Sequence, residues 1–228
     1  MTVAQFYRIN GRSILLGAIL FTVHIVLRSL VTAGLDPATF ALQSSWIQIN
    51  AVGVIGAALV LLGLPVLYTK LAARSGWLGL FGVALIALAW MFFGLFLSLY
   101  SVLVAPWLAA QVPALAAAAL PSGILIAYLT ALVSELVGCV LLAIPFFQGR
   151  LQPRWVGYAL PGAAILTVVG TLLAPSGPAA NLAINLLSNT GPMLLMAALG
   201  YLGFQMGSNH ISTPNARRRE ANREAVSL

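Results

Sequence analysis

The chain has 228 residues, of which 61% are hydrophobic and 7% are charged, and its formal net charge is +7. Soluble domains are about half apolar and about a quarter charged, so this composition excludes an ordinary soluble domain. A helix needs about 20 mainly apolar residues to cross a bilayer, and the chain is therefore long enough for about six spans. The sequence predicts an all-α integral membrane protein.

Six apolar stretches follow one another along the chain, each ended by glycine, proline or a charged residue. They are predicted as transmembrane helices at 14–34, 47–69, 77–104, 124–147, 155–174 and 181–204. Lipid offers no partner to backbone polar groups, so stretches of this length are expected to be helical. We therefore expect a six-helix transmembrane domain over 1–206 and a disordered basic tail over 207–228.

The basic residues predict how the bundle is oriented. Ten of the 11 Lys and Arg residues precede the first span, lie in the second or fourth connection, or follow the last span. A six-span chain places all of these positions on one side, which the positive-inside rule makes cytoplasmic. We expect a cell-membrane protein with both termini in the cytoplasm and with anionic inner-leaflet lipids as partners. Short basic turns of this kind argue against a nucleic-acid partner.

The outer connections carry signals of their own. In LDPATFALQSSW, Asp36 is a candidate N-cap and Pro37 a candidate first residue of a short interfacial helix before Trp46. The Ala-rich segment 105–123 is divided by prolines and is expected to lie along the outer membrane surface. Trp107 in that segment suits the aromatic belt.

Two of the inner turns resemble each other. LPVLYTKLAARSGWLG (64–79) aligns with IPFFQGRLQPRWVG (144–157) when two residues are gapped. Both turns connect an inward helix to an outward one, which predicts that 47–104 and 124–174 are parallel repeats of one helical hairpin. Convergence is the alternative, because any cytoplasmic turn favours basic residues and an interfacial tryptophan.

The same turns suggest a family. The pattern LY-x2-L-x2-R-x2-WLG, the segment QPRWVGYAL and the opening GRSILLGAIL resemble a bacterial multi-pass membrane family catalogued as domain of unknown function 4386. The resemblance extends from the first to the fifth predicted span and leaves out the last span and the Ala-rich connection. It implies a helical membrane bundle and no known chemistry.

Several polar residues fall inside the predicted spans. Glu135, one of only 4 acidic residues, is near the middle of 124–147. His24 and Arg28 share one face of the first span, since positions i and i+4 align on a helix. A charge alone at a helix centre costs about 2.5–3.5 kcal/mol. The last span carries a polar stripe in its outer half, which comprises Asn181, Asn185, Ser188 and Asn189. Asn50, near the start of the second span, lies at a depth similar to that of the stripe.

These depths predict one shared polar cavity in which Arg28 reaches towards Glu135. The candidate residues are His24, Arg28, Asn50, Glu135, Asn185, Ser188 and Asn189. Simpler roles compete with this interpretation. Arg28 could extend to the outer headgroups, His24 could be a packing residue, and the asparagines could only join helices by hydrogen bonds.

A helix break is predicted within SNTGPMLLM. Pro192 lacks a backbone donor and disfavours helical geometry at Gly191, which predicts a kink or break there. Transporters use broken helices at their binding sites. An ordinary proline kink is the alternative.

The sequence argues against several chemistries. The single cysteine, Cys139, cannot form an intramolecular disulfide or a Cys-rich metal site, and one intramembrane histidine cannot ligate a bis-histidine haem. No hydrolase or phosphate-loop motif occurs. We therefore predict no catalytic residues, no metal and no cofactor, which favours a protein that is not an enzyme.

Three functions follow from these residues. The leading prediction is that the protein binds or transports an unknown small molecule, or a proton, through the polar cavity. The second is a structural or accessory membrane subunit whose polar groups only specify helix packing. The third is a membrane-embedded lipid-modifying enzyme with His24 or Glu135 as the acid–base group.

Overall fold

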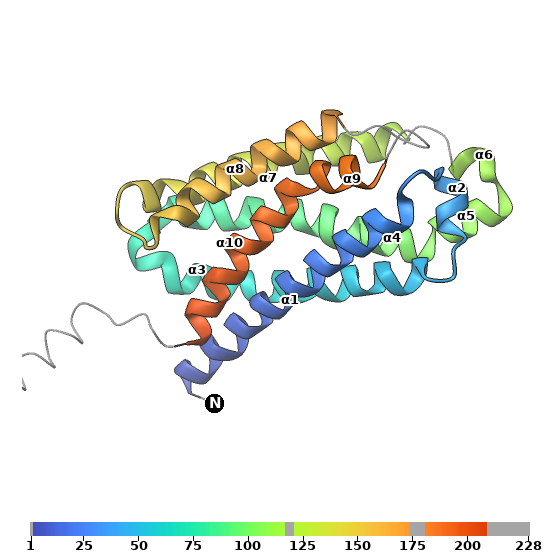
Figure 1. Ribbon diagram of the computed structural model, residues 1–228. Helices are drawn as coiled ribbons and strands as arrows, with labels where there is room; N and C mark the ends of the chain where they lie inside the picture. The colour runs from blue at the N-terminus through green and yellow to red at the C-terminus, as the bar shows by residue number, and fades with distance from the viewer. Residues whose placement is uncertain (1, 117–120, 174–180, 209–228) are drawn as a thin grey trace, which may run out of the picture.

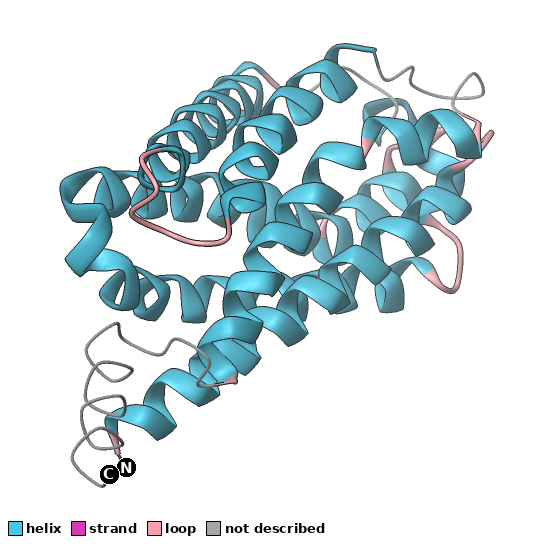
Figure 2. Ribbon diagram, turned by 60° about the vertical axis from the view of Figure 1, so that its left-hand side comes forward, coloured by secondary structure: helices cyan, strands magenta, loops and turns pink. Residues whose placement is uncertain are grey.

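The computed structural model describes residues 2–116, 121–173 and 181–208, and all the elements in these ranges are helical (Figures 1 and 2). The elements are α1 (Val3–Thr32), α2 (Pro37–Ala41), α3 (Trp46–Trp90), the π-helix η1 (Met91–Phe96), α4 (Leu97–Leu103), α5 (Ala105–Gln111), α6 (Pro113–Ala116), α7 (Ser122–Phe147), α8 (Arg154–Leu173), α9 (Leu182–Ser188) and α10 (Thr190–Gly207).

The long helices fit a multi-pass membrane bundle. Within the described ranges, five helices are long and apolar enough to cross a membrane, and the number rises to six if the bent pair α9 and α10 is one span. They follow the predicted spans in order, at Val3–Thr32, Trp46–Ala72, Arg74–Gln111, Ser122–Phe147, Arg154–Leu173 and Leu182–Gly207. Of the predicted tail, the structure describes only the first two residues, the end of α10 and Ser208.

The first helix begins earlier than the predicted residue 14. The Thr2 hydroxyl accepts a hydrogen bond from the Gln5 backbone N–H, and the Gln5 side chain accepts one from the Thr2 backbone N–H. This reciprocal capping box satisfies two of the donors that a helix start leaves unpaired. The helix therefore starts at a polar cap, well before the hydrophobic stretch that the prediction was based on.

The two inner turns have different conformations. Between the second and third spans the chain stays helical except at Gly76, whose φ of 54° suits a residue without a side chain. Between α7 and α8 a non-helical turn follows Phe147, with Gly149 at a φ of 70°. The two turns therefore do not share a conformation, and the parallel repeat stays a prediction from the sequence.

Short helices cover the end of the bundle that lies away from the N-terminus (Figure 1). As predicted, Asp36 caps α2 and Pro37 is its first residue, with the Asp36 carboxylate accepting from the backbone and the hydroxyl of Thr39. These hydrogen bonds, the hydroxyl's first, lower the pKa of the Asp36 carboxyl. Under α2 and α5, the buried Trp46 indole donates to the Ser101 carbonyl at 2.8 Å. We call α2, α5 and α6 the outer cap.

Glycine pairs bring the main helices into backbone contact. At three crossings, a methyl group on either glycine would lie 2.5–3.0 Å from the carbonyl oxygen of its partner. Lipid does not drive helices together as water does, so association depends on close packing at small residues. The pairs are Gly11 with Gly203 (α1 and α10), Gly17 with Gly56 (α1 and α3), and Gly82 with Gly138 (α3 and α7).

Apolar side chains lie on the outside of the bundle as well as inside it. Leu62, Phe81 and Val133 each expose more than half of their surface, which suits contact with lipid chains. Inside, Ile14 and Leu142 are fully buried in one continuous core. Cys139, in the apolar helix α7, is buried in the same core.

The glycine contacts predict a stability difference within one helix. Gly138→Ala would place a methyl group 2.9 Å from the Ile86 backbone nitrogen, whereas Gly123→Ala, also in α7, would project into open space. We expect Gly138→Ala to lower Tm in detergent, with overpacking costing about 1–3 kcal/mol. Gly123→Ala should leave Tm unchanged or raise it slightly. Equal Tm values for the two variants would contradict the packing described above.

Candidate functional site

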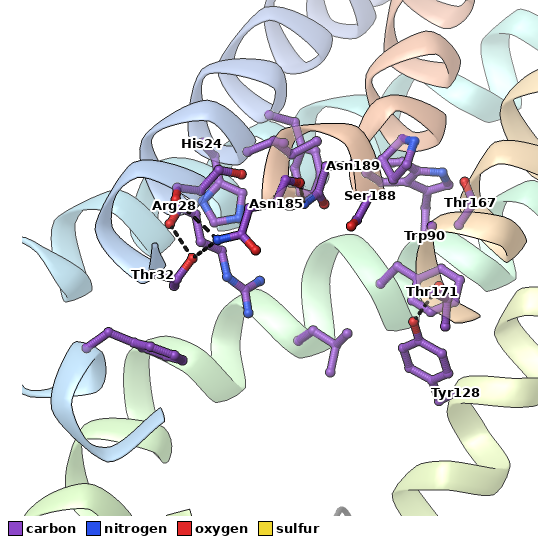
Figure 3. A pocket seen from close by; sticks show the side chains of 18 of the residues that line it. His24, Arg28, Thr32, Trp90, Tyr128, Thr167, Thr171, Asn185, Ser188 and Asn189 are labelled. Atoms are coloured by element: carbon purple, nitrogen blue, oxygen red, sulfur yellow. Dashed lines mark hydrogen bonds between the residues drawn. The ribbon is translucent and has the colours of Figure 1, made fainter. Parts of the chain in front are cut away.

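A cavity of about 440 Å³ extends into the bundle beneath the outer cap (Figure 3). Its walls come from α1, α2, α7, α8, α9 and the start of α10, and from the chain between Trp90 and Leu97. Small-molecule sites in proteins have about 300–1,000 Å³, so the volume suits a small ligand. Among the predicted site residues, those that line the cavity are His24, Arg28, Glu135, Asn185, Ser188, Asn189 and Pro192.

His24 is a buried residue on the α1 wall with a defined hydrogen bond. Its Nδ1 lies 2.9 Å from the Ile49 carbonyl oxygen. Because a carbonyl only accepts, Nδ1 carries a proton, and Nε2 of a neutral ring is left as an acceptor. The ring also packs against Phe21 and lies over Gly53, where a side chain would collide with it. His24 is therefore held in one orientation.

Arg28 does not pair with Glu135. The carbon atom of the Arg28 guanidinium lies 5.6 Å from the centre of the Trp46 ring, beneath the outer cap. In the described ranges no carboxylate forms an ion pair with Arg28, and the predicted approach to Glu135 is therefore wrong. A cation over an aromatic face is an alternative stabilisation, and it directs Arg28 towards Trp46. Arg28 lines the cavity, and its alternative role at the outer headgroups stays a prediction.

Glu135 is bound by Thr167 of α8. Glu135 is only 2% exposed, and its Oε1 accepts a hydrogen bond of 2.9 Å from the Thr167 hydroxyl. The same hydroxyl lies 3.0 Å from the Ala163 carbonyl. It can donate to an ionised Glu135, or accept from a protonated Glu135 while donating to Ala163. The same atomic positions thus suit both protonation states.

The polar stripe of the last span connects α9 to α1. The Asn185 amide donates to the Thr32 hydroxyl at 3.2 Å and to the Ser29 carbonyl at 3.4 Å (Figure 3). The side chains of Ser188 and Asn189 instead donate to carbonyls of their own helix. Of the four residues in the stripe, Asn185 forms an interhelical link, Asn181 caps α9 by accepting from the Ile184 N–H, and Ser188 and Asn189 line the cavity.

The last span is bent by 49° at Asn189, between α9 and α10. The bend lies before the predicted position, because Gly191 and Pro192 belong to the first turn of α10. Proline suits a first turn, where backbone N–H groups have no helical acceptor. α8 packs closely on both sides of the bend, with Gly170 against the Ser188 carbonyl and Gly191 against Thr167.

Two predicted residues lie away from the cavity. Asn50 is buried in α3, where its amide donates to the Trp46 carbonyl at 2.8 Å. Its Oδ1 has no hydrogen-bond partner within the described residues. Gly191 faces Thr167 and does not line the cavity. Position along a span does not decide contact with the cavity, because the rotation of each helix about its axis sets which way a residue faces.

Sequence reasoning missed six polar residues that line the cavity, namely Ser29, Thr32, Trp90, Tyr128, Thr167 and Thr171. The hydroxyls of Tyr128 and Thr171 lie 3.0 Å apart and join α7 to α8 (Figure 3). Trp90 directly precedes η1, and π-helical turns are frequent at functional sites. The hydroxyl of a threonine in a helix commonly donates a hydrogen bond to a carbonyl of the preceding turn. A threonine within a predicted span is therefore no sign of a functional site.

The described residues include no group of three or more His, Cys, Asp or Glu side chains that could hold a metal ion. The polar groups that line the cavity are one guanidinium, one carboxyl group, one imidazole, and several hydroxyls and amides. These groups can form hydrogen bonds and ionic contacts with a ligand.

Comparisons of the chain with models of protein families, with curated proteins and with solved structures find no match. The family resemblance of the inner turns accordingly stays a prediction.

Two double-mutant cycles distinguish the observed partner of Glu135 from the expected one. Glu135→Met keeps the length of the side chain and removes its charge and acceptors, and Thr167→Val removes the donor at nearly constant shape. We expect this pair to show an interaction energy of about 0.5–3 kcal/mol in thermal unfolding. Glu135→Met and Arg28→Gln should be additive within about 0.5 kcal/mol. The opposite result, coupling of Glu135 to Arg28 and additivity with Thr167, would support the ion pair predicted from the sequence.

Proposed function

We propose that the protein binds a small molecule in the intramembrane cavity and moves it across the membrane. The observation that carries this proposal is the convergence of charged and polar side chains from separate helices on one cavity of about 440 Å³. Such groups are costly inside a bilayer and mark substrate or ion pathways when they face a cavity. Elsewhere in the described bundle the buried polar side chains are serine hydroxyls and one amide, whereas the buried histidine and the buried carboxyl group, His24 and Glu135, both lie at this cavity.

The bend at Asn189 supports the transport part of the proposal. It interrupts a span beside the cavity, and interrupted helices in transporters form substrate and ion sites near the middle of the membrane. Two glycine contacts to α8 hold both sides of the bend. Relative movement of α8 and α10 would therefore reshape the cavity wall at Thr167.

Glu135 suits proton exchange in the same site. Its hydrogen bond to Thr167 is compatible with a charged and a neutral carboxyl group, because Thr167 has a second acceptor at Ala163. A group that accepts both states without rearrangement can take up and release a proton while a ligand binds. We include a proton as the coupled species or as the transported one.

A structural or accessory role remains the second candidate, favoured by the hydrogen bonds that Asn185, Ser188 and Asn189 already make within the protein. Native mass spectrometry of the gently purified protein separates the candidates. A retained small molecule supports binding, and a retained protein subunit without one supports the accessory role. Turnover of lipid in the absence of a gradient would support the lipid-modifying enzyme.

Filling the cavity should abolish binding while leaving the bundle folded. Thr171 lines the cavity, whereas its neighbour Leu172 is 76% exposed on the outside of α8. We expect Thr171→Phe to lose the molecule retained by the wild-type protein, and Leu172→Phe to keep it. Native mass spectrometry measures retention, and Tm in detergent checks folding. Equal retention by two folded variants would contradict a ligand in this cavity.

We also propose that both termini are cytoplasmic in a bacterial cell membrane. The N-terminus, the turn at Gly76 and the turn after α7 lie at the same end of the bundle (Figure 1). The basic residues in the described part of these three regions are Arg8, Arg12, Lys70, Arg74, Arg150 and Arg154. Cytoplasmic loops carry an excess of Lys and Arg, and anionic inner-leaflet lipids would attract them.

Thiol labelling tests this orientation. Cysteines introduced at the exposed positions Leu42 and Leu115, in a Cys139→Ala background, should react with an impermeant reagent outside intact cells. A cysteine at the exposed Gln148, at the other end, should react only after the cells are opened. Labelling of Gln148→Cys from outside intact cells would show that the orientation is the opposite of the one proposed, and it would leave the fold as described.

A further inference from the structure

The Arg28 guanidinium is a cation inside the cavity without a compensating charge nearby in the described residues. It points into the cavity from α1 (Figure 3), and its neighbour is the face of Trp46. A guanidinium has five N–H donors, and within the described ranges no hydrogen bond joins them to a protein acceptor. Arg28 therefore keeps its full capacity to bind an acceptor that enters the cavity.

Trp90 provides a second unused donor. Its side chain lines the cavity and is only 1% exposed, yet its indole N–H has no acceptor in the described part of the chain. Buried donors are paired in the great majority of cases, so an orphaned one needs an explanation. The indole nitrogen itself has almost no accessible surface, so an acceptor on a bound ligand reaches it only with a local shift of the Trp90 side chain or its neighbours. The orphaned donor is independent of the charge on Arg28 and favours a ligand with acceptor atoms.

The acidic and basic groups that share the cavity do not neutralise Arg28. Glu135 is bound by Thr167, and the Nδ1 proton of His24 is directed to the Ile49 carbonyl. The Tyr128 hydroxyl is engaged with Thr171. The cavity thus offers the uncommitted donors of Arg28, and its carboxyl group already has a partner. The indole N–H of Trp90 is unpaired and buried in the cavity wall.

On the basis of the proposed function, we propose that the ligand is a small anion whose carboxylate or phosphate group binds to the Arg28 guanidinium, with Trp90 as a second donor. The planar fork of arginine matches two oxygen atoms of such a group and forms short, charge-assisted hydrogen bonds. A cavity of about 440 Å³ holds a small anion or a lipid headgroup, and excludes a whole lipid. Both sources present the same chemistry to Arg28.

A series of probes with one shape and three charges tests this assignment. Benzoate, benzamide and benzylamine are titrated into the purified full-length protein in lipid-free detergent, by calorimetry and thermal shift. We expect benzoate to bind at least about tenfold more tightly than benzamide, because a charged partner strengthens the hydrogen bonds of a guanidinium. Benzylamine should bind most weakly. Inorganic phosphate tests the second anionic group.

Variants of the two donors locate the effect. Arg28→Gln should weaken benzoate binding about tenfold to a hundredfold and change benzamide binding little. Arg28→Lys should recover part of the loss, because it restores the charge without the fork. Trp90→Phe keeps an aromatic ring, removes the indole N–H and should lower the affinity for the anions by a smaller factor. Arg12→Gln, on the exposed part of α1 away from the cavity, is the matched control.

The outcomes separate this inference from the proposed function. Equal affinity for benzoate and benzamide, or unchanged benzoate binding by folded Arg28→Gln, overturns the anion assignment and leaves a ligand cavity intact. The absence of binding by every probe and by short-chain phosphatidylglycerol overturns both proposals. Binding of that lipid with dependence on Arg28, without binding of the free anions, identifies a lipid headgroup as the source.

Discussion

The bundle depends on helices that meet backbone to backbone at glycine pairs. Three crossings bring α1 against α3 and α10, and α3 against α7, so closely that a single methyl group at any of these glycines would meet a carbonyl oxygen of the facing glycine. In lipid, apolar side chains gain little by leaving their solvent, and close packing has to supply the association. The glycine positions therefore determine which helices are neighbours and how near their axes lie.

The cavity forms where this regular packing is interrupted. The last span turns by 49° at Asn189, and a π-helix begins after Trp90 on the facing wall. Gly170 and Gly191 keep α8 in contact with both sides of the bend, so the interruption stays local. An irregular backbone in a membrane is tolerated where it lies within protein or lines a cavity. The irregular backbone and the polar side chains of the bundle thus occur together at the cavity.

Most polar groups of the cavity have partners, and the exceptions indicate function. Asn185 joins α9 to α1, and Thr167 supplies the donor for Glu135. Arg28 and Trp90 have no hydrogen-bond acceptor in the described ranges for their side-chain donors. Packing alone explains the first group of residues. It does not explain a cation that faces the cavity without a partner, beside a buried indole N–H that also lacks one, and a bound anion accounts for the cation.

The sequence by itself determined the helices, their order, and the depth of His24, Arg28 and Glu135, because span length and depth are properties of one element with a rise of about 1.5 Å per residue. Only the tertiary structure decided the partners. Glu135 meets Thr167, which is 32 residues away, and Arg28 turns to Trp46, although depth alone suggested that the two charges would meet. Contact depends on how each helix is rotated about its axis, and that rotation is set by the glycine crossings between helices.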